Sequence, residues 1–409
     1  MDRVGSSPKI RVAERIRGFG TTIFTEMTDL AVRHQAVNLG QGFPNFPSPD
    51  FLKEAARRAV YADQNQYARS PGHPRLVEIL ASRLSGEFGR SLDPRAEITV
   101  TAGATEGIFL SAQAFLEPGD EVVLIEPFYD GYPAVSEMCG ARCVYVPLQA
   151  GADGKWFLAP GDLEKAFNHK TKMLFLNTPH NPTGKVFTPR ELERIAELCI
   201  RFDVLAVSDE VYDRMVFDGR EHCRLAAMPG MWDRTITLGS AGKTFSVTGW
   251  KIGWAVAPAP LSDGLRKVHQ WVTFAVSTPL QEAVAIALEE ADSRGYYREL
   301  REMYQGKRDF LVRALRESGF SVCVPEGTYF VLADFRSWGL DHDEEFCRYL
   351  TSEVGVAAIP PSTFYCGPHQ GLARTMARFC FCKTDDTLGE AAGRLERGFR
   401  TRPGRGRIG

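Results

Sequence analysis

The sequence predicts an α/β fold with a large, mainly parallel seven-stranded sheet covered by helices, and a smaller α+β domain. Short and almost continuously apolar segments alternate with helical segments between residues 97 and 257. This alternation is typical of parallel strands that are buried on both faces. The length of 409 residues also exceeds the size at which one hydrophobic core usually keeps growing. We therefore expect two domains.

Seven apolar segments are the expected strands of the large sheet. They lie at residues 98–101, 121–125, 142–146, 172–176, 204–207, 235–238 and 252–257. Before them we expect an amphipathic helix at 23–30, a short strand at 37–39, and helices at 53–61 and 76–88. Asp50 is the expected N-cap of the helix at 53–61. A further helix at 189–202 would connect the fourth and fifth strands of the sheet.

The part of the chain after Pro260 predicts the smaller domain. We expect one long helix at 279–316, a helix at 343–353, and short strands at 321–324, 329–333, 356–359 and 377–382. The N-terminal segment, residues 1–49, is expected to join this domain. The predicted division is then a large domain at 50–290, a small domain at 291–397, and a flexible basic tail at 398–409.

Composition gives no sign of a nucleic-acid or membrane partner. The formal net charge is −2, and no apolar run approaches the ~18 residues that a membrane span needs. The nine cysteines are scattered without a CxxC pair, so we expect neither a metal site nor a disulfide framework. Together with a polar N-terminus that lacks an apolar signal region, this pattern predicts a cytoplasmic protein.

The stretch LGSAGKTFSVTGWKIGW, residues 238–254, holds two lysines among small residues. Lys243 could be approached closely by a flat ligand, and Lys251 could add a second positive charge. We interpret this stretch as a reactive lysine beside a phosphate site. A nucleotide-binding loop is the second interpretation, but Thr237 stands where that motif needs glycine. A glycine-rich surface turn with solvated lysines is the third.

Other candidate residues follow the expected strands, where α/β sheets bind ligands. Gly103, Ala104 and Thr105 lie at a strand-to-helix junction that favours a phosphate. Asp209 ends an apolar strand, so it is either a helix N-cap or the partner of a protonated pyridine nitrogen. Tyr212 lies one helical turn further along and could donate a hydrogen bond to a phenolate-type oxygen.

Arg378 lies among apolar and aromatic residues of an expected strand. Its guanidinium could grip an α-carboxylate through two hydrogen bonds, or it could form a structural ion pair. Lys243 could in turn form a covalent bond to an aldehyde and then move a proton. A buried lysine in positively charged surroundings has a depressed pKa, which suits this task near neutral pH.

Several long motifs, taken in order, resemble those of the class I aminotransferases, which are fold-type I pyridoxal-phosphate enzymes. The resemblance runs from about Arg15 to Arg397. Within this class, the chain most resembles the group of the kynurenine aminotransferases and glutamine transaminase K, together with the methionine aminotransferases. The motifs that carry it are VNLGQGFPNFPSPDF, NQYARSPGHPRL, IEPFYDGY, LNTPHNPTGKVF, SDEVYDRMVFDG, GMWDRTITLGSAGKTFSVTGWKIGW, GTYFVLADF and ARFCF.

The resemblance implies pyridoxal 5'-phosphate as the cofactor and assigns roles to individual residues. Lys243 would be the Schiff-base lysine, Asp209 would pair with the pyridine nitrogen, and Tyr212 would hold the 3'-oxygen; these are the implied catalytic residues. Phe128 would stack on the cofactor ring. The implied cofactor-binding residues are Tyr67, Gly103, Ala104, Thr105, Phe128, Asn181, Asp209, Tyr212, Ser240, Lys243 and Lys251.

The resemblance also implies a homodimer with shared active sites. Tyr67 would reach the cofactor phosphate of the neighbouring subunit, and Phe274 would line the pocket of that subunit. The implied substrate-binding residues are Phe24, Gly42, Asn181, Phe274 and Arg378. The partners would be an amino acid and a 2-oxo acid, with the amino group moved by a ping-pong mechanism.

Three positions depart from the kynurenine group, and all concern the side-chain pocket. Thr105, Ala275 and Phe24 stand where that group often has tyrosine, histidine and tryptophan, respectively. Aromatic amino acids, methionine, glutamine and kynurenine all remain possible donors, as does N-succinyldiaminopimelate. Two other functions also remain open: a carbon–sulfur β-lyase on the same cofactor site, and a non-catalytic regulatory protein on this fold.

Overall fold

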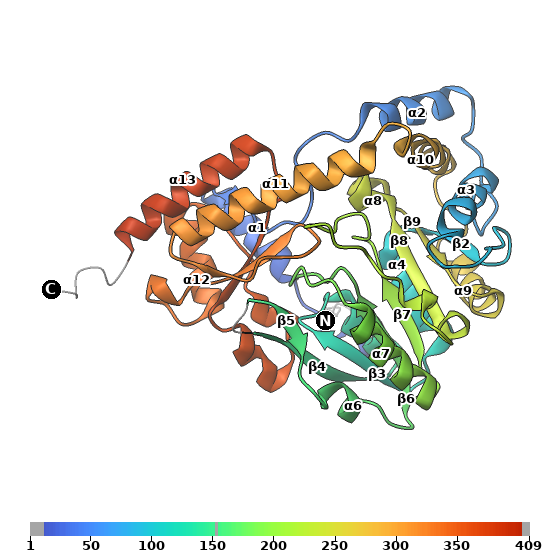
Figure 1. The fold of residues 1–409 in the computed structure, drawn as a ribbon, viewed down its shortest axis with the longest axis horizontal. Coiled ribbons are helices and arrows are strands. Elements are labelled where there is room, and N and C mark those ends of the chain that lie inside the picture. Colours follow the sequence, from blue (N-terminus) through green and yellow to red (C-terminus); the bar gives the residue numbers. More distant parts are fainter. Residues whose placement is uncertain (1–11, 152–153, 403–409) are drawn as a thin grey trace, which may run out of the picture.

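The structure of the chain, a computed structural model, describes residues 12–151 and 154–402 (Figure 1). Its longer helices are α1 (Ile23–Arg33), α2 (Asp50–Tyr61), α3 (Pro74–Ser85), α4 (Gly103–Phe115), α5 (Gly131–Met138), α7 (Pro189–Phe202), α9 (Ala259–Val272), α10 (Thr278–Ala291), α11 (Tyr296–Glu317), α12 (Asp343–Tyr349) and α13 (Asp385–Thr401). Two short helices are α6 (Asp162–Ala166) and α8 (Ala241–Thr244).

The strands form three sheets within the described residues. The strands are β1 (Val37–Asn38), β2 (Ile98–Ala102), β3 (Glu121–Glu126), β4 (Arg142–Ala150), β5 (Trp156–Leu158), β6 (Thr171–Asn177), β7 (Leu205–Asp209), β8 (Thr235–Ser240), β9 (Ile252–Val256), β10 (Ser321–Val322), β11 (Phe330–Asp334), β12 (Val356–Ala357) and β13 (Met376–Cys380). The large sheet has eight strands in the order β2-β9-β8-β7-β6-β3-β4-β5.

All seven predicted strands are present in the large sheet, and the mainly parallel arrangement is confirmed. Strands β8, β7, β6, β3 and β4 run parallel to one another, whereas β9 is antiparallel to both β2 and β8. The predicted count was one too low, because β5 adds an antiparallel edge strand to β4. Its three residues are too few to show a strand pattern in the sequence.

Both faces of the large sheet are covered by helices (Figure 1). One buried cluster joins Ile108 of α4 and Leu265 of α9 to Val122 and Ile236 of the sheet. Another joins Ile195 of α7 to other sheet residues. Helices α2, α3 and α10 pack together at the β2 side of the sheet, in a third cluster. Because both faces of the central strands are buried, neither face carries a row of polar side chains, and these strands are almost entirely apolar.

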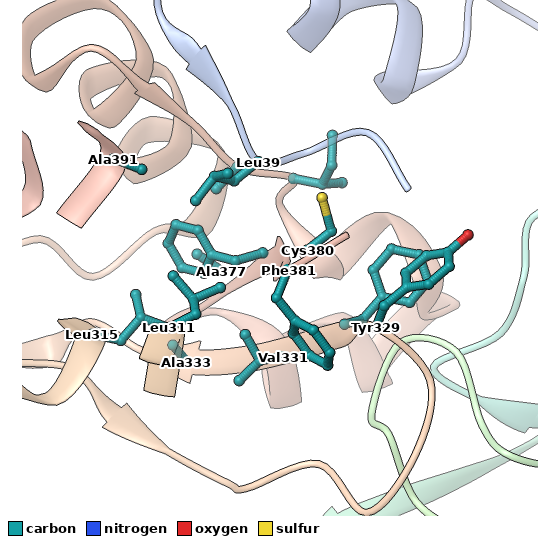
Figure 2. Close-up of a cluster of buried hydrophobic side chains, with 14 of the residues drawn as sticks. Leu39, Leu311, Leu315, Tyr329, Val331, Ala333, Ala377, Cys380, Phe381 and Ala391 are labelled. Atoms are coloured by element: carbon teal, nitrogen blue, oxygen red, sulfur yellow. The ribbon is translucent and has the colours of Figure 1, made fainter. Parts of the chain in front are cut away.

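The N-terminal and C-terminal segments share one core, as expected. This cluster joins Met27 and Leu39 to Leu311 of α11, Val331 of β11 and Leu395 of α13. Figure 2 draws Leu39 and Ala391 in the same cluster as Val331 of β11 and Ala377 of β13. Strands β10, β11 and β13 form an antiparallel sheet there, and β1 pairs in parallel with β12. The exact domain boundaries stay predictions.

Three local predictions were wrong. The single helix expected at 279–316 is two helices, α10 and α11, because Gly295 adopts φ of +68° in between and starts a new helix direction. Pro49, not Asp50, occupies the N-cap of α2. Helix α13 continues to Thr401, so the basic tail does not begin at residue 398; residues 403–409 lie outside the described residues. In the described part of the chain, no helix has the length and apolar character to cross a membrane.

Candidate active site

A cavity of about 340 Å³ lies at the carboxyl ends of the central strands. The residues that line it come from the N-terminal segment, the strand ends of the large sheet, and strands β11 and β13. They are Phe24, Gln41, Gly42, Gly103, Ala104, Thr105, Ile108, Tyr129, Tyr132, Asn177, Asn181, Asp209, Val211, Tyr212, Ser240, Gly242, Lys243, Thr248, Lys251, Phe330 and Arg378. Most of the predicted site residues therefore meet in one place.

Three predicted site residues do not line this cavity. Phe128 is buried in the core beside Tyr145, with the ring centres 5.5 Å apart. The next residue, Tyr129, lines the cavity instead. The prediction that Phe128 faces the cofactor is therefore wrong, and Tyr129 is the neighbouring aromatic residue whose ring could stack there. Tyr67 and Phe274 lie on the surface and are discussed below.

Asp209 is a buried carboxylate at the end of β7. The Tyr132 hydroxyl donates to its Oδ2 at 2.7 Å, and the Val211 N–H donates to Oδ1 at 3.4 Å. Burial raises the pKa of Asp209 to about 6, although the Tyr132 hydrogen bond and the charge of Lys243 act in the opposite direction. A carboxylate held in this way can accept a hydrogen bond from a protonated ring nitrogen.

Lys243 reaches the cavity from α8, the short helix that follows β8. Its Nζ lies 5.8 Å from the ring centres of both Tyr212 and Tyr329. Burial lowers the pKa of Lys243, and the positive charges of Lys251 and Arg378 lower it further, while Asp209 acts against them. The amine is therefore easier to deprotonate than an exposed lysine, as a nucleophile and proton carrier requires.

The N-terminus of α4 forms the anion-binding end of the cavity. Gly103 begins this helix with φ of +72°, and a Cβ at this position would lie 3.1 Å from Lys251 Nζ. Lys251 Nζ also donates to Thr105 Oγ1 at 3.4 Å. Ser240 caps α8, where its Oγ accepts the Gly242 N–H. Free helix N–H groups beside an ammonium group suit a phosphate.

Arg378 of β13 forms the opposite end of the cavity. Its side chain is only 2% exposed, yet it forms no ion pair among the described residues. Nη2 donates to the Gly40 carbonyl at 2.8 Å and Nη1 to Asn181 Oδ1 at 3.5 Å, while Nε has no hydrogen-bond partner in the described chain. Burial lowers the pKa of Arg378 to about 10. Such a guanidinium can bind an incoming carboxylate.

A polar network connects the substrate end to the pyridine end. The Asn181 N–H donates to Asn177 Oδ1 at 2.6 Å, and Asn177 Nδ2 donates to the Asp209 carbonyl at 2.8 Å.

Sequence reasoning missed Asn177, Tyr132 and Phe330, which all line the cavity. Asn177 ends the apolar strand before Asn181, so its position carried a signal, whereas Tyr132 and Phe330 could not be told from core aromatics.

These residues fit pyridoxal 5'-phosphate. A buried carboxylate, a lysine with a lowered pKa and an anion-binding helix N-terminus lie around one cavity at the strand ends. Arg378, free of any carboxylate partner in the described chain, remains for the carboxylate of an amino acid. This combination of fold and site defines a fold-type I pyridoxal-phosphate enzyme.

The comparisons with known proteins identify the family. The family model for aminotransferase class I and II matches residues 34–395. A kynurenine–oxoglutarate transaminase from Dictyostelium discoideum is 44% identical over 410 residues, covering 93% of this chain and 94% of that protein. The chain therefore belongs to the class I and II aminotransferase family, and it is a pyridoxal-phosphate-dependent transaminase.

Two solved structures are similar over almost their whole length. The N-succinyldiaminopimelate aminotransferase from Mycobacterium tuberculosis has a TM-score of 0.90 and 43% sequence identity, covering 95% of this chain and 100% of that chain. An Escherichia coli protein with a methionine aminotransferase function has a TM-score of 0.89 and 38% identity, with the same coverage. The relatives thus share the fold and reaction type but differ in the named amino donor.

Proposed function

We propose that this transaminase moves the amino group of an L-amino acid with an uncharged side chain to a 2-oxo acid. Aromatic amino acids, methionine, glutamine and kynurenine are the donor types that we favour. Arg378 carries the proposal: its guanidinium carbon lies 4.4 Å, 4.9 Å and 5.1 Å from the ring centres of Phe330, Phe24 and Phe364. An α-carboxylate bound there would place the substrate side chain beside aromatic rings.

The charges inside the cavity support an uncharged side chain. Lys243, Lys251 and Arg378 are the cationic residues among those that line it, and each already has a task in our proposal. A donor that carries further carboxylates, such as N-succinyldiaminopimelate, would have no counter-ion of its own inside the cavity. Since an unpaired carboxylate is costly to desolvate, we rank this alternative below the uncharged donors.

We assign the following roles to the residues of this chain. When bound, the cofactor supplies an electron sink for the substrate's amino carbon. Lys243 would hold the cofactor and then move a proton at that carbon, and Asp209 would keep the pyridine nitrogen protonated. Tyr212 and Asn181 would donate to the 3'-oxygen. The N-terminus of α4, together with Ser240 and Lys251, would hold the phosphate.

Labelling of Lys243 tests the assigned covalent role independently of turnover. Borohydride reduction of the purified enzyme should attach the cofactor to the peptide that contains Lys243. The Lys243→Ala variant should show no label and no measurable transamination. Attachment at another lysine, or full activity in the variant, would show that the assigned base is wrong.

A panel of amino donors against a few 2-oxo acids tests the proposed specificity. We expect the kcat/KM values for aromatic, methionine, glutamine or kynurenine donors to exceed that for N-succinyldiaminopimelate. Cysteine conjugates in the same panel test the β-lyase alternative. Release of pyruvate and ammonia from them, without an oxo-acid acceptor and faster than transamination, would favour the lyase.

We also propose that the enzyme works as a homodimer with shared active sites. Tyr67 is 82% exposed, Phe274 is 49% exposed, and their rings pack edge to face with centres 5.3 Å apart. Neither ring lines the cavity of its own subunit, and Trp271, three residues before Phe274 in the sequence, is 84% exposed. A second copy would cover this apolar surface and receive both rings at its own site.

Subunit complementation tests the shared site. Tyr67→Ala and Lys243→Ala homodimers should both transaminate poorly, because each site lacks one residue. Mixed dimers should regain activity at the site that combines wild-type Lys243 with wild-type Tyr67 of the other subunit. A monomer by light scattering, or no gain on mixing subunits that do exchange, would contradict the proposal.

A further inference from the structure

A short stretch of the N-terminal segment, Gly40–Phe43, is held by side chains from the far end of the chain. Each of its four carbonyl oxygens accepts a hydrogen bond from a side chain at residue 329 or later. The donors are Arg378 Nη2 to Gly40 at 2.8 Å, Cys380 Sγ and Lys383 Nζ to Gln41, both at 3.1 Å, Tyr329 Oη to Gly42 at 2.6 Å, and Lys383 Nζ to Phe43 at 2.8 Å.

The N–H groups of the same stretch are satisfied with one exception. Asn38 Oδ1 accepts the Gly40 N–H at 2.9 Å and the Gln41 N–H at 3.1 Å, and the Phe43 N–H bonds to the Gln41 carbonyl. Within the described residues, the Gly42 N–H has no acceptor. Gly42 lines the cavity, and a Cβ there would lie 2.4 Å from the Phe330 ring. This N–H is therefore the unsatisfied donor of the stretch, at a residue that lines the cavity.

Lys383 is an unusual donor to this stretch. It is 3% exposed, but in the described chain it forms no ion pair with a carboxylate. Its Nζ instead bridges the carbonyls of Gln41 and Phe43, on either side of Gly42, and lies 4.5 Å from the centre of the Phe43 ring. Burying an unpaired ammonium group is costly, so this bridge calls for a functional reason.

One peptide group links Lys383 to the cavity. The Gln41 carbonyl, which accepts from Lys383, and the Gly42 N–H are two ends of the same peptide unit. A cation on the oxygen pulls electron density from the nitrogen and makes the N–H a stronger donor, since consecutive hydrogen bonds polarise one another. Bridging both carbonyls also fixes the direction of the N–H.

We propose that Lys383 is a positioning residue for substrate: it orients and polarises the Gly42 N–H as the second donor, beside Arg378, for the carboxylate of the amino acid and of the 2-oxo acid. The inference rests on the proposed function, because it assumes that the carboxylate binds at Arg378. Lys383 contacts neither cofactor nor substrate itself and acts only through the Gln41–Gly42 peptide.

The Lys383→Met variant tests this role. We expect KM for amino donor and oxo-acid acceptor to rise about tenfold, as when one charge-assisted hydrogen bond is lost, with kcat nearly unchanged. Affinity for the unreactive carboxylate 3-phenylpropionate should fall equally, whereas affinity for its neutral amide should not change. Amide hydrogen exchange in residues 38–45 should become faster. Lys383→Arg keeps a cation with several donors and should restore most of the affinity.

Lys307→Met is the matched control. Lys307 also lies over an aromatic ring of the N-terminal segment, 5.6 Å from the centre of Phe46, but it pairs with Asp385 rather than with a carbonyl. It should leave all KM values unchanged. If Lys383→Met changes carboxylate affinity no more than Lys307→Met does, or weakens the neutral amide equally, the proposal is overturned. Wild-type affinity for 3-phenylpropionate, and its loss in Arg378→Met, tests carboxylate binding at Arg378 separately.

Discussion

Asp209 and Glu210 are adjacent at the end of β7, and both are buried, but they face opposite surroundings. Asp209 faces the active-site cavity and forms no ion pair among the described residues; burial raises its pKa to about 6. Glu210 accepts from Arg224 Nη1 at 2.5 Å and from His222 Nε2 at 2.8 Å. Burial acts on Glu210 too, but these two neighbours hold its pKa below the ordinary value.

The two buried arginines show the same contrast. Arg224 pairs with Glu87, Glu210 and Asp213, whereas Arg378 pairs with no carboxylate in the described chain. Burial tends to lower the pKa of both, but the carboxylates around Arg224 raise its pKa instead. We infer that the completed ion cluster around Arg224 stabilises the fold and that the unpaired Arg378 is left for a ligand. This difference separates structural from functional charges without reference to any relative.

Breaking the completed cluster should have the largest effect on stability. In Arg224→Met, three carboxylates lose their common cation, and one of them, Glu210, is fully buried, so the free energy of unfolding should fall by about 3 kcal/mol. Urea unfolding of the variant and the wild type measures this fall. The kinetic constants of the folded fraction should stay close to wild type. A loss below about 1 kcal/mol would contradict the structural role.

Removing the cavity arginine should reverse this pattern. Arg378→Met should leave the free energy of unfolding unchanged or higher, because a buried and unpaired cation is removed. The kcat/KM values for amino donor and acceptor should fall about 100-fold or more, since a buried charge pair with substrate is lost. Steady-state kinetics and urea unfolding of one preparation measure both effects. If Arg224→Met and Arg378→Met lower the free energy of unfolding equally, the distinction between a structural and a ligand-binding arginine fails.

The pH dependence of stability should distinguish the two adjacent carboxylates. The folded pKa of Asp209, about 6, lies above the ordinary 3.8, so the fold favours the protonated carboxyl. This contribution is complete below pH about 4 and is lost as the pH rises through about 6, by at most about 3 kcal/mol. Unfolding of cofactor-free wild type and Asp209→Asn across this range should show the loss only in the wild type. If the stability of Asp209→Asn falls with rising pH as steeply as that of the wild type, other titratable groups cause the pH dependence.

The smallest effect is expected at the exposed end of the cavity. Lys251 is exposed, and its charge is screened by water. Lys251→Met should therefore weaken cofactor binding by about 1 kcal/mol, or about fivefold, with little effect on the KM values of the substrates. Titration of the cofactor-free protein measures this change. If Lys251→Met weakens cofactor binding by as large a factor as Arg378→Met lowers kcat/KM, the difference in exposure does not explain the different importance of the two cations.

Much of the fold and the site was predictable because the signals are local. Apolar runs marked seven strands, and polar or glycine residues directly after them marked Gly103, Asn181, Asp209 and Lys243. What failed was the choice between neighbours. Phe128 and Tyr129 are both aromatic and adjacent, and only the direction of each side chain decides which one lines the cavity.

The sequence by itself predicted the order of most elements, a candidate reactive lysine and, through resemblance, the family, which the comparisons confirm. Tertiary structure alone decided which charges have partners. The sequence marked Arg378 through its apolar strand, but it did not show that Arg224 has three carboxylate partners while Arg378 has none in the described chain. Likewise, the contacts from Lys383 to the Gln41 and Phe43 carbonyls join positions more than 300 residues apart. Whether two charged groups pair depends on the distance between them in the folded protein, and the periodicity of the sequence does not give that distance.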